Sequence, residues 1–152
     1  VGVSQTVTVS LGHKLDPRWG KPIEVTGTVE RLSDGRFTYS GGVWDGVEAE
    51  MGLSAVLEIG SIRVLVTTNA TYDWRDEQFR SAGLDPATAK FIVAKNPMNF
   101  REAYGALTNT FIILDTPGPT PATVKHVEFQ RLERPFFPAD EDIPGMRPVI
   151  LS

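Results

Sequence analysis

The spacing of apolar residues changes once along this chain, and that change restricts the folds it can adopt. Apolar and polar residues alternate along residues 3–11 and again along residues 23–32. A period of two residues is typical of strands with one buried face. After residue 73 apolar residues recur at helical spacing, with short apolar runs between the helical segments. The chain must therefore join a strand-rich half to a half that contains helices.

Turn residues divide the strand-rich half into hairpins. Residues 23–39 contain Ser33-Asp34-Gly35 between two alternating runs, and residues 54–67 contain Gly60-Ser61 in the same position. Each arrangement predicts an antiparallel hairpin, because these residue types favour tight turns. The uninterrupted apolar run Val64-Leu65-Val66 predicts a strand that is buried on both faces.

The second half alternates between strands and helices. The sequence predicts a strand at 62–67, a helix at 73–82, a strand at 91–94, a helix at 97–107 that begins at Pro97, and a strand at 111–114. Asp85 before Pro86 predicts a further short helical turn with Asp85 as its N-cap. Consecutive strand–helix–strand units usually form a parallel patch. We therefore predict an α/β (mixed α+β) fold, in which N-terminal antiparallel hairpins join a β-α-β-α-β unit in one mixed-sheet domain.

Composition excludes several classes of function. The 152 residues fit a single domain, and a net charge of −4 gives no reason to expect nucleic acid as a partner. The chain has no cysteine, which excludes disulfides, thiolate nucleophiles and zinc–thiolate sites. No apolar run is long enough to span a membrane and no signal pattern opens the chain, so we expect a cytoplasmic protein without a membrane partner.

The two ends of the sequence suggest that it belongs to a longer protein. It opens at Val1, already in a strand-like alternation, and it ends in the apolar tail 147–152. A fragment or processed domain fits both observations, and a sequence shortened at both ends for expression fits them equally well.

The segment 95–101 holds the strongest candidates for a functional site. It places Lys95, Asn99 and Arg101 between two predicted strands, where side chains from a rigid scaffold can converge on a ligand. The cations Lys95 and Arg101 would hold a carboxylate, a peptide carbonyl or an acidic residue of another domain. The backbone amides that follow Pro97 would add positive potential there. The alternative interpretation is that Lys95 and Arg101 are ordinary solvated charges.

The histidines do not make a metal site. His13 and His126 are the only two, whereas zinc needs three or four ligands. His13 lies in a glycine-containing loop beside Lys14 and Asp16, where it is either a polar group at the edge of a site or simply an exposed loop residue. The acidic residues are explained by turns and helix caps, and no pair resembles the two carboxylates of acid–base catalysis. As a free-standing enzyme, the sequence is therefore a poor candidate.

Eight short pieces of the chain, in order, resemble the C-terminal domain of the MlrC-like (microcystinase C, M81 family) metallopeptidases. Any one piece is weak, but eight in the right order are fairly specific, and they span nearly the whole chain. The pieces are residues 11–17 with 20–22, 26–29 with 32–37, 51–57, 79–86, 90–95, 99–101, 114–118 and 134–140.

The resemblance implies a two-domain hydrolase of roughly three times this length, with its zinc ligands in a preceding N-terminal domain. This chain would carry no cofactor of its own and would form one wall of the substrate cleft. Lys95 and Arg101 match the family's Lys-Ser-x-x-His-Phe-Arg pattern, and Lys14 and Asp16 match its Gly-Gly-Lys-x-Asp loop. The departures are Asn99 for the family's histidine, Asn96 for its serine and His13 for its second glycine. An asparagine at 99 can still donate a hydrogen bond, but it cannot carry protons near neutral pH.

Two functions remain open. In the first, the chain is the C-terminal domain of a zinc-dependent amidohydrolase or peptidase and provides Lys95, Asn99 and Arg101 to a small peptide or amide substrate, with Lys14, Asp16 and His13 nearby. Its partner is then the N-terminal metal-binding domain of the same protein, and a homo-oligomer is compatible with this function. In the second, it is a non-catalytic binding or assembly module that docks a partner through exposed aromatic residues. The candidates for that docking are Trp19, Trp44, Phe136 and Phe137. The alternative interpretation is that these aromatic residues belong to the core or to a smaller apolar cluster.

Overall fold

The computed structural model describes residues 1–14, 16–96, 98–116, 118, 122–124, 127–140, 142–143 and 145. The chain divides into two compact units, Val1–Phe111 and Ile112–Ser152, and each is described by itself. The expectation that residues 1–152 form a single domain stays a prediction. In the described part of the chain, none of the helices has the length and apolar character that a bilayer crossing requires.

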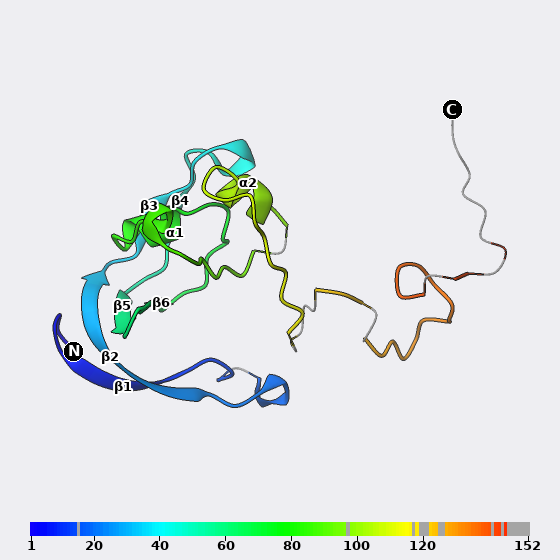
Figure 1. Ribbon diagram of the computed structural model, residues 1–152, viewed down its shortest axis with the longest axis horizontal. Coiled ribbons are helices and arrows are strands. Elements are labelled where there is room, and N and C mark those ends of the chain that lie inside the picture. Colours follow the sequence, from blue (N-terminus) through cyan, green and yellow to red (C-terminus); the bar gives the residue numbers. More distant parts are fainter. Residues whose placement is uncertain are drawn as a thin grey trace. The chain divides into compact units, whose positions relative to one another are not determined.

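A four-stranded antiparallel sheet forms the centre of the first unit. Its strands are β1 (Thr6–Leu11), β2 (Ile23–Ser33), β5 (Ser54–Ile59) and β6 (Ile62–Thr67), in the order β1-β2-β5-β6 (Figure 1). In β1, half-buried residues alternate with exposed ones along the whole strand, as the two-residue period predicts. The long strand β2 pairs with both of its neighbours, and its register shifts at a bulge between Val29 and Arg31.

The buried core of the first unit lies where β2 and β5 meet the segments packed on them. Met51, Val29 and Val56 are its most buried large side chains, each with at most 2% of its surface exposed. The other buried hydrophobic residues among those described are Tyr39, Leu57, Ala82 and Tyr104. The core therefore draws on both the strand-rich half and the helical half of the unit.

The predicted hairpin at residues 23–39 does not form. β2 pairs with β1 and β5, whereas β3 (Arg36–Thr38) pairs with β4 (Glu48–Glu50) in a separate two-stranded antiparallel sheet. Between β2 and β3, Gly35 has φ +74° and its carbonyl accepts a hydrogen bond of 2.9 Å from the Met51 amide. A Cβ atom at residue 35 would lie 2.3 Å from the Gly52 carbonyl oxygen. The Ser-Asp-Gly turn is thus a corner between two sheets, because a tertiary contact fixes its direction.

The predicted hairpin at residues 54–67 is confirmed. β5 and β6 pair antiparallel from Ile59 opposite Ile62 to Ser54 opposite Thr67. The prediction that residues 64–66 are buried on both faces is wrong, because all three are only half-buried. The reason is that β6 is an outer strand of its sheet, with β5 as its only neighbour among the described strands.

Short helices complete the first unit. They are η1 (Pro17–Trp19), η2 (Gly42–Trp44), α1 (Glu77–Ser81), η3 (Pro86–Thr88) and α2 (Phe100–Tyr104). The Asp85 cap is confirmed, since its carboxylate accepts a hydrogen bond of 3.1 Å from the Ala87 amide. Both longer helices are shorter than predicted; Pro97, where the second was expected to begin, lies outside the described residues. Figure 1 shows α1 beside β3, which it contacts.

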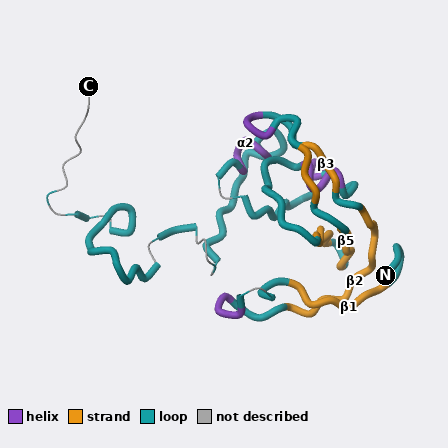
Figure 2. The backbone as a smooth tube through the Cα atoms, turned by 180° about the vertical axis from the view of Figure 1, so that it is seen from behind, coloured by secondary structure: helices purple, strands orange, loops and turns teal. Residues whose placement is uncertain are grey.

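The α+β class is confirmed, but the predicted β-α-β-α-β unit is not formed among the described residues. Every strand pair is antiparallel, and residues 91–94 and 111–114 carry no strand. Figure 2 shows both segments as loop. Their backbones make no hydrogen bonds with other described residues, so no described strand pairs with these two apolar segments.

The second unit has no helix or strand in its described residues. One loop is nevertheless well connected. The Arg134 guanidinium forms an ion pair with Asp140, and the Asp140 carboxylate also accepts a hydrogen bond of 2.8 Å from the Phe136 amide. The hydrogen bond from Arg134 lowers the pKa of Asp140. The Phe136 ring meets the Phe129 ring edge-on, with centroids 5.2 Å apart.

Candidate functional site

A buried asparagine caps the turn that leads into α2. Asn96 has 7% of its surface exposed, and its Oδ1 atom accepts a hydrogen bond of 3.0 Å from the Asn99 amide. This is the geometry by which a side chain caps a helical turn. The Nδ2 group of Asn96 is buried and has no hydrogen-bond acceptor among the described residues. Asn96 therefore sets the backbone position of Asn99.

Asn99 joins α2 to the loop at residues 71–76. The Tyr72 hydroxyl donates a hydrogen bond of 3.2 Å to Asn99 Oδ1, and Asn99 Nδ2 donates to the Trp74 carbonyl. Both polar groups of the amide therefore have a partner within the fold. Its first role in this chain is to hold the loop against the helix.

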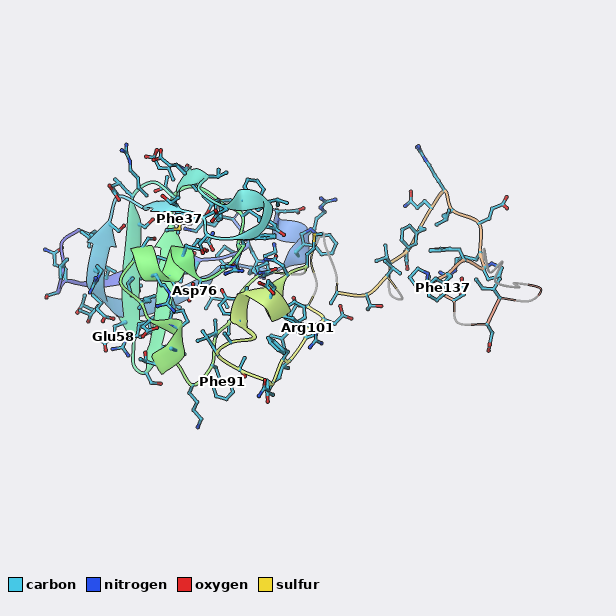
Figure 3. All side chains as sticks on the ribbon, turned by 90° about the horizontal axis from the view of Figure 1, so that it is seen from above. Phe37, Glu58, Asp76, Phe91, Arg101 and Phe137 are labelled. Atoms are coloured by element: carbon cyan, nitrogen blue, oxygen red, sulfur yellow. The ribbon has the colours of Figure 1, made fainter. Side chains whose placement is uncertain are left out.

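Arg101 is held by aromatic rings and exposed to solvent. Its guanidinium lies 5.1 Å from the centroid of the Phe100 ring and 5.2 Å from that of the Phe111 ring. The two rings meet edge-on, 5.4 Å apart. We call Phe100, Arg101 and Phe111 the arginine clamp. Within the described part of the chain, no carboxylate forms an ion pair with Arg101, which leaves its five donors facing solvent. Figure 3 labels Arg101, which belongs to α2.

Lys95 is exposed and precedes Asn96 directly. It makes no hydrogen bond or ion pair with any residue that the structure describes. The structure thus brings Asn99 and Arg101 together at the start of α2, and it places Lys95 just before the buried cap.

The early loop forms a separate group of predicted residues. It lies at one end of the β1–β2 ribbon (Figure 1). Asp16 caps η1 and pairs with Arg18, with Nη2 to Oδ2 at 2.6 Å, and these hydrogen bonds lower the pKa of Asp16 to about 2. His13 has φ +48°, and its exposed ring lies against Gly20. Lys14 is exposed. No hydrogen bond or ion pair among the described residues joins this loop to the segment 95–101.

Sequence reasoning missed a half-buried carboxylate next to α2. Burial raises the pKa of Asp73 to about 6, and the nearby Glu77 carboxylate adds to the rise. The Tyr104 hydroxyl lies 3.4 Å from Asp73 Oδ1, which partly opposes that rise, while burial and the Asp73 charge raise the pKa of Tyr104 itself. Asp73 was assigned to a helix N-terminus. No sequence signal reveals its burial, which depends on the packing of Tyr104 from α2.

The loop at 71–76 also carries an arginine and a chain of aromatic rings. Arg75 pairs with Glu102 of α2 at 2.8 Å, and its buried Nε group has no acceptor within the described part of the chain. Trp74 Nε1 donates to the Gly41 carbonyl at 2.9 Å, and the Tyr39 hydroxyl donates to the Tyr72 carbonyl at 2.6 Å. Successive ring centroids lie 4.9 to 6.2 Å apart along the series Phe37, Tyr39, Trp44, Tyr72 and Trp74. This loop therefore connects β3, η2 and α2.

The described residues do not fit a metal ion. Among them, no group of three or more His, Cys, Asp or Glu side chains is placed to hold one. His126, to which we assigned no function, lies outside the described residues. An open cavity of about 590 Å³ lies over the β3–β4 sheet, and its lining contains none of the predicted site residues. The lining is Arg36, Phe37, Thr38, Glu48, Ala49 and Glu50.

Comparison with known proteins adds two similarities. A protein-family model described as "MlrC C-terminus" matches residues 1–131. The crystal structure of a "putative metallopeptidase" from Mesorhizobium sp. BNC1 is similar to this chain, with a TM-score of 0.73 and 30% sequence identity. That similarity covers 91% of this chain and 28% of the other, so this chain spans less than a third of the length of that relative. No curated protein matches the chain.

Proposed function

Because this chain belongs to the MlrC C-terminus family, we propose that it is the C-terminal domain of a longer zinc-dependent peptidase or amidohydrolase. The similarity to part of a chain described as a metallopeptidase supports the peptidase assignment. In this proposal the domain forms one wall of a substrate cleft, and the preceding N-terminal domain of the same protein is its partner. The substrate is a small peptide or amide.

The arginine clamp is the observation that carries this proposal. A guanidinium binds a carboxylate or a carbonyl oxygen through parallel N–H donors in a fixed plane. In Arg101 the rings of Phe100 and Phe111 restrain that plane before any ligand arrives. Restraint lowers the side-chain entropy that binding would otherwise cost. Arg101 is therefore placed to bind and orient a carboxylate or carbonyl group of the substrate.

Asn99 and Lys95 support the clamp in different ways. Asn99 holds α2 to the loop through Tyr72 and Trp74, so it fixes the helix from which Arg101 projects. Its amide cannot exchange a proton with substrate near neutral pH, so we assign it binding and positioning rather than proton transfer. Lys95 adds an exposed positive charge next to the same turn. Lys14, Asp16 and His13 stay predicted substrate-binding residues; Asp16 is also engaged by Arg18.

The metal belongs elsewhere in this proposal. Zinc would supply a Lewis acid and an activated water to hydrolysis when bound to the rest of the longer protein. The residues described for this chain do not offer a ligand set for it, so the role that we propose for the chain is to bind, orient and enclose the substrate.

The test is replacement of Arg101 in the full-length protein. Arg101→Ala should lower kcat/KM for peptide or amide substrates by about tenfold or more, because a charge-assisted hydrogen bond is worth about 1.5–3 kcal/mol. Arg101→Lys should recover only part of the loss, since it keeps the charge and lacks the planar donors. Arg36→Ala, another exposed arginine, is the matched control and should leave turnover unchanged. Full activity in Arg101→Ala would refute the proposed role.

An assembly module is the second candidate. Phe137 is 69% exposed, and Trp44 is exposed and stacks on Tyr72 with ring centroids 5.9 Å apart. Exposed aromatic rings of this kind often anchor protein interfaces. Under this function Arg101→Ala would alter association only, whereas Trp44→Ala would weaken association and leave any hydrolysis intact. Trp19 is half-buried, which makes it a weaker anchor.

A further inference from the structure

The segment at residues 91–94 has the composition of a strand, but none of the described strands pairs with it. It reads Phe-Ile-Val-Ala, residue types enriched in sheets. Exposure alternates along it: Phe91 is 74% and Val93 81% exposed, while Ile92 and Ala94 are half-buried. This two-residue period is that of an extended strand with one face on the unit and the other in solvent. Figure 3 shows the Phe91 side chain pointing away from the rest of its unit.

The backbone of this segment also lacks hydrogen-bond partners among the described residues. Between Lys90 and Lys95, no amide or carbonyl group forms a hydrogen bond with another described residue. Extended backbone with free donors and acceptors is a template for strand addition. Two large apolar side chains, Phe91 and Val93, are exposed beside it, and removing such side chains from water is favourable. The segment therefore presents both the hydrogen-bonding groups and the apolar surface of an edge strand.

A second segment, in the other unit, has the same character. Ile112, Ile113 and Leu114 are between 63% and 72% exposed, so side chains on both faces of the extended chain meet solvent. Their backbones also make no hydrogen bonds with described residues. An apolar run exposed on both faces is what a strand buried inside a larger sheet looks like when its neighbours are absent.

We propose that residues 91–94 and 112–114 are interface strands that pair, by strand addition, with the part of the longer polypeptide lying outside this chain. The size of the structural relative argues for that occupant, because 72% of its chain has no counterpart here. The family description, a C-terminus, also places further chain before this region in its members. This inference rests on the proposed function only in that both require a longer protein. It needs neither a metal nor hydrolysis.

Hydrogen–deuterium exchange on the full-length protein tests the proposal. Amides 91–94 and 112–114 should exchange at least about tenfold more slowly than expected for unpaired backbone, because strand pairing protects them. Val93→Lys should abolish the protection at 91–94 by placing a charge in the interface. Val43→Lys is the matched control, since Val43 is the same residue type and 85% exposed in η2, and it should leave the protection intact. If Val93→Lys fails to fold, Phe91→Lys serves in its place.

Each other outcome overturns the proposal. Unprotected amides at both segments show that no strand is added. Protection that appears only at concentrations where the protein dimerises assigns the partner of each segment to a second copy. A natural polypeptide without residues beyond this chain removes the proposed partner. Unprotected segments in a protein whose Arg101→Ala variant loses activity refute this proposal alone. Protected segments together with full activity in Arg101→Ala refute only the proposed function.

Discussion

Replacing Asp73 by asparagine should change how the stability of the protein depends on pH. The wild-type carboxyl group holds its proton up to a pKa of about 6 in the folded protein, compared with 3.8 for an ordinary aspartate. Between these two values the folded state binds more protons than the unfolded state, so the free energy of unfolding falls as pH rises. Above about pH 6 the full cost of burying the charge is present.

The magnitude follows from the same two values. A tenfold change in proton affinity is worth about 1.4 kcal/mol, so a pKa rise from 3.8 to about 6 corresponds to about 3 kcal/mol. Water reaches part of the Asp73 side chain and screens its charge, which reduces the expected effect to about 1.5 kcal/mol. Asp73→Asn should therefore be about 1.5 kcal/mol more stable than wild type at pH 7.5 and nearly equal to it at pH 4. The asparagine oxygen can still accept the hydrogen bond from Tyr104.

Urea denaturation at half-unit steps from pH 4 to pH 7.5 measures this difference. Asp115→Asn, at an exposed aspartate, is the control and should retain the wild-type pH dependence. Two results would show that burial of Asp73 does not govern how stability changes with pH. In one, the free energy of unfolding of Asp73→Asn changes with pH as it does in the wild type; in the other, the variant is less stable by the same amount at every pH.

Two further predictions concern the backbone. Gly35→Ala should lower the free energy of unfolding by about 2–4 kcal/mol, because it adds a Cβ clash with the Gly52 carbonyl to the strain of φ +74°. Gly46→Ala is the control, since residue 46 has φ +76° with nothing within 4 Å of the added Cβ, and it should cost about 1 kcal/mol. Equal losses of stability in thermal or urea melts would refute the contact between Gly35 and Gly52. Asn96→Ala should cost about 1–2 kcal/mol by removing the cap before α2, whereas exposed Asn109→Ala should be neutral; an unchanged melting curve for Asn96→Ala would contradict the capping role.

Local patterns predicted the features that depend on local chemistry. The strands β1, β5 and β6 and the Asp85 cap follow from alternation, turn residues and a cap-then-proline pair, all of which act within a few residues. The direction of the chain at Gly35 depends on Gly52, which is distant in sequence, so the turn type alone gave the wrong partner for β3. The strands expected at 91–94 and 111–114 need partners that the described chain does not supply.

The same limit applies to the candidate site. Residue types and the family pattern selected Arg101, and the structure adds the Phe111 ring from ten residues away, which no pattern predicts. Asp73 gave no signal because its burial depends on Tyr104 of α2. The sequence also did not predict that Asn99 connects α2 to the 71–76 loop by hydrogen bonds. From the residue type alone, Asn99 could only be compared with the histidine of the family pattern.

The series of aromatic rings from Phe37 to Trp74 gives the protein a built-in optical probe. Trp44 and Trp74 both lie within 6.2 Å of the Tyr72 ring, so light absorbed by this tyrosine is transferred to an indole with high efficiency. Ring pairs this close also produce near-ultraviolet circular dichroism. Trp19, in η1, belongs to no such pair among the described rings and contributes separate emission. Binding at the arginine clamp that shifts the 71–76 loop will therefore change tyrosine-to-tryptophan transfer without any added label.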